Sequence, residues 1–376
     1  MKIALLSYST KPRGGVVHTL ALAEALARAG ADVTVWTLGR GGDGGFFRPV
    51  DPAVSVQIVP FPDLTPAEPD GARSESVGDR ILRSISVLRA AFTPDAYDIV
   101  HAQDCISANA ADRCIRTVHH LDHFTTPELA ACHERAIVQP YAHICVSAAV
   151  AAEVTAGWGI RPTVIPNGVD ARRFASAASD EPAAAAARSR WRSRFGRYVL
   201  AVGGIEPRKG SLDLLEAYAA VRSTDRDVRL VIAGGETLFD YRDYRARWET
   251  RAAELFAADP AGRPLVLGPV AHDELPSLVA AAGAFCFPSV KEGFGLAATE
   301  ALAAGVPVVT RDLPVLREVF GDTVRYASSP PGFAAALSSA LTAPGSRRLA
   351  GQALAEGYTW HAAAAGHLAF YQRYAG

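Results

Sequence analysis

Residues 288–302 read Pro-Ser-Val-Lys-Glu-Gly-Phe-Gly-Leu-Ala-Ala-Thr-Glu-Ala-Leu, and they follow the apolar run Ala-Phe-Cys-Phe at 284–287. The apolar run predicts a buried strand, and the Ala- and Leu-rich part predicts a helix that ends near Gly305. Gly293 and Gly295 lie between them, where the lack of a Cβ lets the backbone approach a ligand closely. The amino end of a helix at such a junction favours an anionic ligand. The stretch therefore predicts an α/β sheet with a ligand site at this junction.

Two carboxylates flank this junction. Glu292 lies in the predicted loop, and Glu300 lies about two helical turns beyond it, on the side that faces the loop. A carboxylate accepts hydrogen bonds, and the hydroxyls of a buried ribose or sugar donate them. We therefore expect Glu292 and Glu300 to contact hydroxyl groups of one ligand.

Strand-like and helical segments alternate along the whole chain, which is typical of parallel sheets covered by helices on both faces. The 376 residues form two such blocks, so the sequence predicts an α/β fold with two Rossmann-like, doubly wound parallel-sheet domains. We expect the boundary near Val169. Residues 60–78 read as a mobile loop, and the Ala-rich residues 175–188 as a surface helix or linker.

Several further segments carry a family resemblance. They are Gly14-Gly15-Val16-Val17-His18 after the first strand, Thr117-Val118-His119, Pro166-Asn167-Gly168-Val169-Asp170, Gly203-Gly204-Ile205-Glu206-Pro207-Arg208-Lys209-Gly210, and Val266-Leu267-Gly268-Pro269-Val270. In this order, and together with the pair Glu292 and Glu300, they resemble the Glu-x7-Glu retaining glycosyltransferases of family 4, also called glycosyl transferases group 1.

This resemblance implies the GT-B fold, in which two Rossmann-like domains face a central cleft. It implies an acceptor-side domain of residues 1–168, completed by residues 357–376 because the last helix of the family crosses back onto the first domain. Residues 169–356 would form the domain that binds a nucleotide-sugar donor.

The resemblance also assigns site residues. Catalytic roles fall to His119, Glu292, Arg208 and Lys209. The donor would be bound by Gly14, Gly15, Gly204, Arg208, Lys209, Val270, Gly293, Phe294, Gly295, Leu296 and Glu300, and the acceptor side would include His18 and His120. The chain departs from the family at Gly203-Gly204, where a Gly-Arg pair is usual, and at His120, which replaces the usual Asp.

Arg208 and Lys209 suit a departing diphosphate, because cations and helix amides can neutralise its charge without a metal. No Asp-x-Asp triplet follows a predicted strand. We therefore expect a metal-independent enzyme without a cofactor. Resemblance to the family implies front-face displacement, in which an oxygen of the leaving diphosphate helps to deprotonate the hydroxyl of the acceptor.

The histidine-rich residues 119–123, His-His-Leu-Asp-His, have two other interpretations. His119, His120, Asp122 and His123 are residue types that bind zinc or iron, and the segment is also compatible with an ordinary polar loop.

Composition restricts the partners. A formal net charge of −1 gives no field that would attract nucleic acid. The five cysteines contain no Cys-x-x-Cys pair, which favours a reduced, cytoplasmic setting. The first strand begins at residue 2, so we expect no signal peptide, and no apolar run is long enough to predict a transmembrane helix. Peripheral contact with a membrane and the oligomeric state stay open.

Other nucleotide-binding enzymes lack support in the sequence. No Gly-x-Gly-x-x-Gly follows the strands at 3–7 or 198–202, and no Gly-Lys-Ser/Thr is present. The sequence favours a glycosyltransferase that moves a sugar from a nucleoside-diphosphate sugar to a hydroxyl acceptor. A nucleotide-sugar epimerase of the same architecture and a non-catalytic nucleotide-sugar-binding protein are the alternatives. The sugar, the base and the acceptor are not decided by the sequence.

Overall fold

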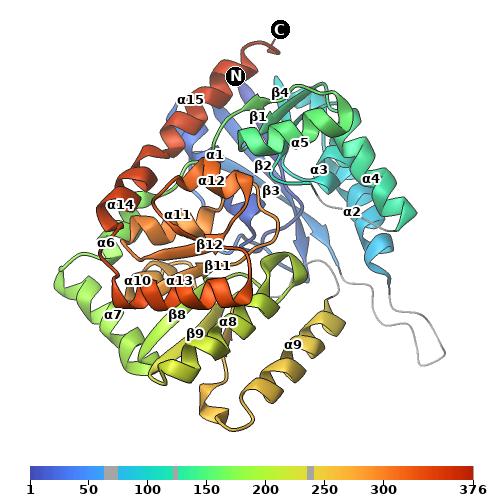
Figure 1. The fold of residues 1–376 in the computed structure, drawn as a ribbon. Coiled ribbons are helices and arrows are strands. Elements are labelled where there is room, and N and C mark those ends of the chain that lie inside the picture. Colours follow the sequence, from blue (N-terminus) through green and yellow to red (C-terminus); the bar gives the residue numbers. More distant parts are fainter. Residues whose placement is uncertain (63–74, 122–125, 235–240, 376) are drawn as a thin grey trace. The chain divides into compact units, whose positions relative to one another are not determined.

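The computed structural model describes residues 1–62, 75–121, 126–234 and 241–375. It divides the chain into two units, one made of Met1–Gly168 and Trp360–Gly376 and the other of Val169–Thr359. Each unit is built on one parallel sheet that is covered by helices (Figure 1). This confirms the predicted α/β class with two Rossmann-like sheets.

The first unit contains a seven-stranded sheet in the order β3-β2-β1-β4-β5-β6-β7. All of its strand pairs are parallel. In sheet order the strands cover Val54–Phe61, Asp32–Arg40, Lys2–Leu6, Ile99–Ala102, Ile115–Val118, Ala142–Cys145 and Thr163–Val164. The chain order reverses between β1 and β4, so the loops after these two strands diverge and leave room for a ligand at the carboxyl edge.

Both faces of this sheet are covered, which explains why β1 is apolar throughout. Successive side chains point to opposite faces, so Ile3 and Leu5 pack in one apolar cluster and Ala4 and Leu6 in another. The helices that complete these clusters are α1 (Gly14–Arg28) and α15 (Trp360–Tyr371) on one face, and α2 (Val77–Ala91), α3 (Cys105–Ala111) and α4 (Pro127–Val138) on the other. Helix α5 (Ala148–Trp158) packs beside β6.

The second unit contains a six-stranded parallel sheet in the order β10-β9-β8-β11-β12-β13. In sheet order the strands cover Leu265–Gly268, Val228–Ala233, Arg197–Val202, Ala284–Phe287, Val308–Arg311 and Arg325–Ala327. Here the chain order reverses between β8 and β11. The loops after these two strands leave the sheet side by side at its carboxyl edge, where ligands of open parallel sheets bind.

Helices cover the second sheet in the same way. One face packs against α8 (Ser211–Thr224), α9 (Arg242–Leu255) and α13 (Pro330–Thr342). On the other face Tyr198 of β8 donates a hydrogen bond from its hydroxyl to the carbonyl of Leu278 in α10 (Leu275–Ala281). The same unit holds α6 (Ala171–Ala177), α7 (Pro182–Phe195), α11 (Leu296–Ala303), α12 (Pro314–Phe320) and α14 (Arg348–Gly357).

Several elements differ from the sequence-based expectations. The last two residues of β3 and the first two of α2 fall inside the predicted loop at 60–78, and residues 63–74 lie outside the described residues. The pattern of β3 is broken by Pro60, which an edge strand tolerates. The Ala-rich stretch forms two helices, α6 and α7, rather than one, and α7 begins at Pro182, a residue favoured in the first turn.

Helix α15 returns the end of the chain to the first unit. Phe370 and Tyr371 are 2% and 0% exposed and belong to the apolar cluster that contains Ile3 and Leu5. Gly366 lies so close to Ile165 that a Cβ there would be 3.2 Å from Cγ2 of Ile165. The last helix is therefore part of the core of the first unit.

Two buried histidines lie where α15 meets the sheet. His101 of β4 and His367 of α15 are both 0% exposed. Nδ1 of His101 is 2.7 Å from the hydroxyl of Tyr371. Burial lowers the pKa of His367 to about 4 and the pKa of His101 well below its usual value, because the charged imidazolium would lose its hydration.

These histidines predict a loss of stability in acid. The unfolded chain binds a proton at each imidazole near pH 6.5, whereas folded His367 does so only near pH 4. The free energy of unfolding of the first unit should be constant above pH 6.5 and fall as the pH drops from 6.5 to 4. His367 alone should account for on the order of 3 kcal/mol. Amide hydrogen exchange of β1 and β4 in urea, at several pH values, measures this loss.

The matched controls are two histidine substitutions in the same helix. His367→Gln should flatten the dependence on pH, whereas His361→Gln should leave it unchanged because His361 is exposed. An unaltered slope in His367→Gln would mean that the buried imidazole is not the source of the acid sensitivity.

Candidate functional site

A polar junction of the second unit lies where its chain order reverses. Strands β8 and β11 are direct neighbours, with Val199 paired to Ala284 and Leu200 to Phe285. Because the strands are parallel, residues 203–210 and residues 288–295 leave the sheet at the same edge. The sequence predicted both loops as parts of one donor site, and the structure brings them together.

A close backbone contact joins these two loops. A Cβ at Gly210 would be 2.3 Å from the carbonyl oxygen of Pro288, so only glycine fits. The φ of Gly210 is +63°, a value that L-residues with side chains rarely adopt. The amide of Val290 donates to the carbonyl of Arg208 over 2.8 Å. These contacts fix the basic residues of one loop beside the acidic residue of the other.

Arg208, Lys209 and Glu292 form the charged centre of this junction. Oε1 of Glu292 accepts hydrogen bonds from Nζ of Lys209 at 2.6 Å and from Nη1 of Arg208 at 3.1 Å. The three side chains are between 11% and 26% exposed, so they are shielded from water but remain accessible. Arg208 is also 3.7 Å from a carboxylate oxygen of Glu206. The sequence predicted these three residues for one site, but not their direct ion pairs.

The glycine-rich turn before α11 has a structural role as well. Gly295 has a φ of +99° and precedes the first turn of α11. A Cβ at this position would be 3.0 Å from the ring of Phe320. Phe294 is 3% exposed and packs edge-to-face on Tyr358, with ring centroids 5.0 Å apart. The side chain of Phe294 is therefore held in the core.

Glu300 lies about one turn into α11, which begins at Leu296. Burial raises the pKa of its carboxyl to about 7, with a smaller lowering by Arg173 and a further rise from Asp170. No described residue donates a hydrogen bond to this carboxyl group. Gly204 follows β8, and Val270 follows β10 after Gly268, so both predicted donor residues lie at the carboxyl edge of the second sheet.

The first unit has its own polar junction at its carboxyl edge. Gly14 and Gly15 begin α1, and a Cβ on Gly15 would be 3.8 Å from Cδ2 of His119. His119 follows β5, and its Nε2 is 3.3 Å from Oε1 of Gln103, which follows β4. Burial lowers the pKa of His119 well below its usual value. The structure thus places Gly15 and His119 together, and the roles assigned to them stay predictions.

His18 is enclosed more deeply than expected for an acceptor-side residue. It is 1% exposed, and its ring lies 4.7 Å from that of His119 and 5.4 Å from that of Trp360. Nδ1 of His18 is 2.8 Å from Oδ1 of Asn167. Its contact with an acceptor stays a prediction. Asn167 belongs to the Pro-Asn-Gly-Val-Asp segment, but the sequence predicted no role for its side chain.

The metal-site interpretation of residues 119–123 finds little support. His120 is half-buried, and Asp122 and His123 lie outside the described residues. Across the residues that the structure describes, no group of three or more His, Cys, Asp or Glu side chains is placed to hold a metal ion.

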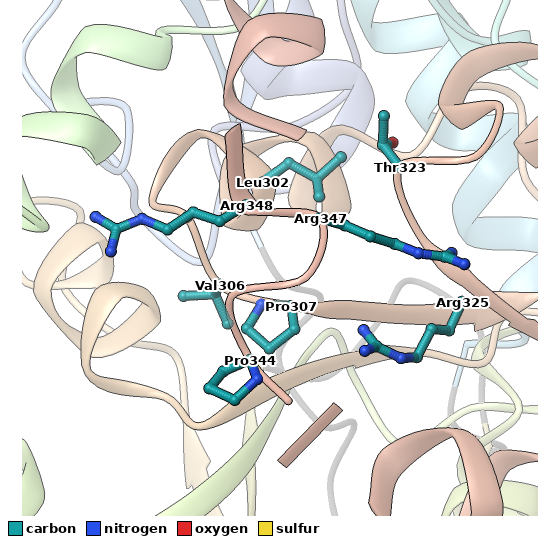
Figure 2. Close-up of a pocket in the computed structure, with 9 residues that line it drawn as sticks. Leu302, Val306, Pro307, Thr323, Arg325, Pro344, Arg347 and Arg348 are labelled. Atoms are coloured by element: carbon teal, nitrogen blue, oxygen red, sulfur yellow. The ribbon is translucent and has the colours of Figure 1, made fainter. Parts of the chain in front are cut away.

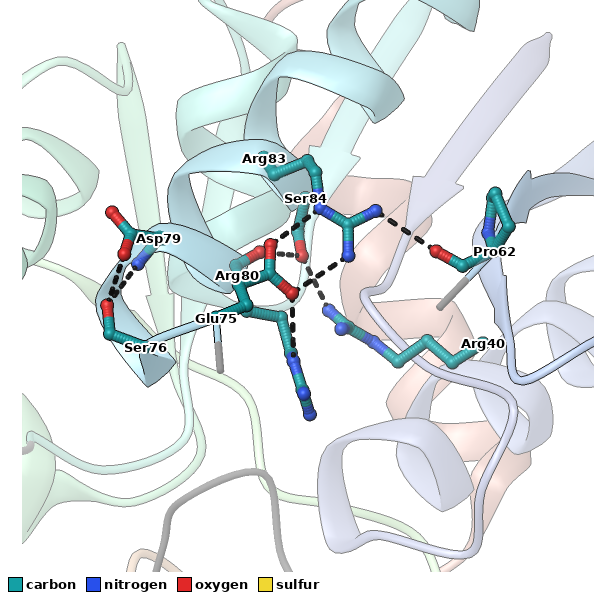
Figure 3. Close-up of polar contacts among 8 residues, drawn as sticks. All are labelled: Arg40, Pro62, Glu75, Ser76, Asp79, Arg80, Arg83 and Ser84. Carbon is teal, nitrogen blue, oxygen red and sulfur yellow. Dashed lines mark hydrogen bonds and ion pairs between the residues drawn. The ribbon is translucent and has the colours of Figure 1, made fainter. Parts of the chain in front are cut away.

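A second polar cluster ties β2, β3 and α2 together in the first unit (Figure 3). Arg83 donates to Glu75 at 2.7 Å and to the carbonyl of Pro62 at 3.1 Å. Arg40 donates to the hydroxyl of Ser84 at 2.8 Å, and burial lowers the pKa of Arg40. These bonds hold the amino end of α2 against the carboxyl ends of β2 and β3.

A surface hollow in the second unit does not coincide with the charged junction. It encloses about 230 Å³, part of it open to solvent, and is lined by Pro307, Arg325, Arg347 and Arg348 among others (Figure 2). Pro307 precedes β12 and Arg325 begins β13, so the hollow lies at the amino edge of the sheet. Arg325 bonds to Ser346 at 2.9 Å, and Arg348 points away from the other two arginines. The arginines therefore tie loops together rather than converge on one point.

Comparisons with known proteins agree with this arrangement. The family described as Glycosyltransferase Family 4 matches residues 12–173, and the family described as Glycosyl transferases group 1 matches residues 189–354. A D-inositol 3-phosphate glycosyltransferase from Salinispora tropica is 29% identical over 366 residues, which cover 86% of this chain and 73% of the relative. An MMP α-(1→4)-mannosyltransferase from Mycolicibacterium hassiacum is 27% identical over 433 residues, covering 99% and 98%.

Solved structures show the same fold at lower identity. Anabaena HepE in complex with UDP and glucose superposes with a TM-score of 0.71 at 20% identity, covering 98% of this chain and 99% of that one. Sucrose-phosphate synthase from Thermosynechococcus elongatus gives a TM-score of 0.76 at 20% identity, covering 99% and 98%. Among the described residues, no helix is long and apolar enough to span a membrane. The chain is a glycosyltransferase of family 4, group 1, with the two-sheet GT-B fold.

Proposed function

We propose that this glycosyltransferase transfers a sugar from a nucleoside-diphosphate sugar to a hydroxyl acceptor and retains the configuration of the anomeric carbon. The donor binds to the second unit and the acceptor mainly to the first. The observation that carries this proposal is the pairing of Glu292 with Lys209 and Arg208 at the point where the chain order of the second sheet reverses. Ligands of open parallel sheets bind at such a point.

The pairing supports a donor whose sugar and diphosphate are covalently joined. The β-phosphate is bonded directly to the anomeric carbon, so groups that hold the two must themselves be neighbours. Lys209 and Arg208 would stabilise the negative charge of the departing diphosphate. Glu292, only 2.6 Å from Lys209, would then lie beside the sugar, where a carboxylate favours the positive charge that develops on the ring.

Glu300 fits the ribose of the same donor. Its carboxyl group accepts no hydrogen bond from the described residues, and burial has raised its pKa to about 7. Hydroxyl donors from a ribose would satisfy it and favour its ionised form. In the reaction, the diphosphate departs toward Arg208 and Lys209, and one of its oxygens takes the proton of the acceptor hydroxyl on the same face. This front-face displacement needs neither a metal nor a covalent nucleophile.

The experiment that tests this function is a screen of UDP-, GDP- and ADP-sugars with excess chelator present. A ligand at 100 times its dissociation constant should stabilise the protein by about 2.7 kcal/mol, which a thermal melt detects. Product analysis with a panel of hydroxyl acceptors should then show transfer with retained configuration. Interconversion of sugars without an acceptor would establish the epimerase instead. Activity that the chelator abolishes and one divalent ion restores would overturn metal independence.

Substitution of the basic loop should weaken binding of the diphosphate. Lys209→Ala removes one of the two cations that pair with Glu292, so turnover should fall by about 10²–10³-fold and nucleoside diphosphates should bind more weakly. Arg208→Ala should behave similarly. Lys291→Ala is the matched control, because Lys291 lies in the same junction and contributes only its carbonyl to the contact with Arg208. Steady-state kinetics that are equal in all three variants would place the phosphate elsewhere.

Substitutions of Glu292 and Glu300 should change different kinetic constants. Glu292→Gln should chiefly lower turnover, because the charge that it balances develops only in the transition state. Glu300→Gln should chiefly raise the Michaelis constant of the donor, because the ribose is unchanged during the reaction. Steady-state kinetics on both variants, with circular dichroism as a control for folding, measures the difference. Wild-type turnover in Glu292→Gln would remove this residue from the site.

The pH dependence of donor binding separates the two roles further. Glu300 is protonated below a pKa of about 7 in the free protein, and the ionised form is the better acceptor for ribose hydroxyls. Donor affinity should therefore rise as the pH increases through about 7, and Glu300→Gln should lose this rise. Glu292→Gln should keep it. Calorimetric titration with the preferred nucleotide sugar reports the affinity directly, because its diphosphate is esterified at both ends and does not titrate near pH 7.

A further inference from the structure

A chain of buried polar side chains runs through the first unit from α15 to His119. The hydroxyl of Tyr371 is 2.7 Å from Nδ1 of His101, and Nε2 of His101 is 2.7 Å from the hydroxyl of Thr117 and 3.3 Å from Nε2 of Gln103. Oε1 of Gln103 is in turn 3.3 Å from Nε2 of His119. His101, Thr117 and Tyr371 are fully buried, and Gln103 is 2% exposed. These four side chains are therefore shielded from bulk water.

The amide of Gln103 determines which atom donates and which accepts in each of these hydrogen bonds. Its oxygen can only accept a hydrogen bond, so the facing Nε2 of His119 must carry a proton. Its nitrogen can only donate, so the facing Nε2 of His101 must present a lone pair. His101 then carries its proton on Nδ1 and donates it to the hydroxyl of Tyr371, while the hydroxyl of Thr117 donates to Nε2. One amide thus sets the tautomers of two imidazoles.

With its proton on Nε2, His119 has a lone pair on Nδ1. No described residue bonds to Nδ1 of His119, and burial keeps the imidazole neutral, because its pKa lies well below the usual value. A neutral imidazole protonated on Nε2 can accept a hydrogen bond at Nδ1 and cannot donate one there. His18, its ring neighbour, is oriented by Asn167 instead and does not share this amide.

We propose that Gln103 is a positioning residue that holds His119 with its proton on Nε2, so that Nδ1 accepts a hydrogen bond from a hydroxyl of a sugar substrate. This inference rests on the proposed function, because it takes His119 as a contact of the substrate. It excludes an acceptor atom of the substrate, such as a phosphate oxygen, as the partner of Nδ1, since two acceptors would then face each other.

The tautomers can be observed without any activity. The 15N chemical shifts of histidine distinguish Nε2-H from Nδ1-H, and the signals are assigned by their loss in His119→Asn and in His101→Asn. We expect His119 as the Nε2-H form and His101 as the Nδ1-H form at neutral pH. The reversed pair, with His119 as Nδ1-H and His101 as Nε2-H, would overturn the proposal.

Three variants separate positioning from packing. Gln103→Leu removes both amide bonds, so His119 should become a mixture of tautomers. Gln103→Glu can only accept, so His119 should keep the Nε2-H form while His101 changes to Nε2-H. Thr117→Val is the matched control, because it deletes a bond to His101 and leaves the contact between Gln103 and His119 intact. An unchanged His119 signal in Gln103→Leu would overturn the proposal.

Kinetics then test the use of this tautomer. Gln103→Leu should lower turnover by about tenfold or more, and Gln103→Glu should recover most of it. Altered tautomers with unaltered kinetics in Gln103→Leu would overturn the substrate contact of Nδ1. If the wild-type protein binds and transfers no nucleotide sugar, the proposed function is wrong. The 15N spectra would still test whether Gln103 sets the tautomer of His119.

Discussion

The charged junction of the second unit is held together by the ion pairs of Glu292 with Lys209 and Arg208. They connect two loops that leave neighbouring strands, and the connection is tight because Gly210 lies against the carbonyl of Pro288. At 11% to 26% exposure the charges are partly removed from water, so an unpaired member would be costly. The ion pairs therefore hold the two cations and the carboxylate of this junction together in one place.

The two units stabilise the polar groups at the carboxyl edges of their sheets in different ways. The second uses opposite full charges whose attraction survives in a partly dry site. The first uses neutral histidines, with pKa values lowered by burial, and hydrogen bonds to Gln103, Asn167, Thr117 and Tyr371. Charged junctions suit the stabilisation of a departing anion, whereas neutral ones suit the orientation of hydroxyl groups.

The sequence predicted the sheet class and the junctions well, because both follow from local patterns. The apolar run before Pro288 and the glycines after it required a strand, a turn and a helix at those residues, and α11 begins at Leu296 as a consequence. Strand β3 runs two residues into the predicted loop at 60–78, because an edge strand tolerates Pro60. The ion pair between Lys209 and Glu292 could not be predicted from the sequence, because it depends on the pairing of β8 with β11 and not on any spacing along the chain. For the same reason the roles of Gln103 and Asn167 were not predicted, because each contacts a histidine from another part of the sequence, His119 and His18 respectively.

The position of α15 has a consequence for synthesis of the protein. The core of the first unit contains Phe370 and Tyr371, and the bond from His101 to Tyr371 joins residues that are 270 positions apart, on either side of the whole second unit. The ribosome makes these residues only after all of Val169–Thr359. The second unit can thus be completed while the first still lacks a helix, so the unit that is begun first is the one that is finished last.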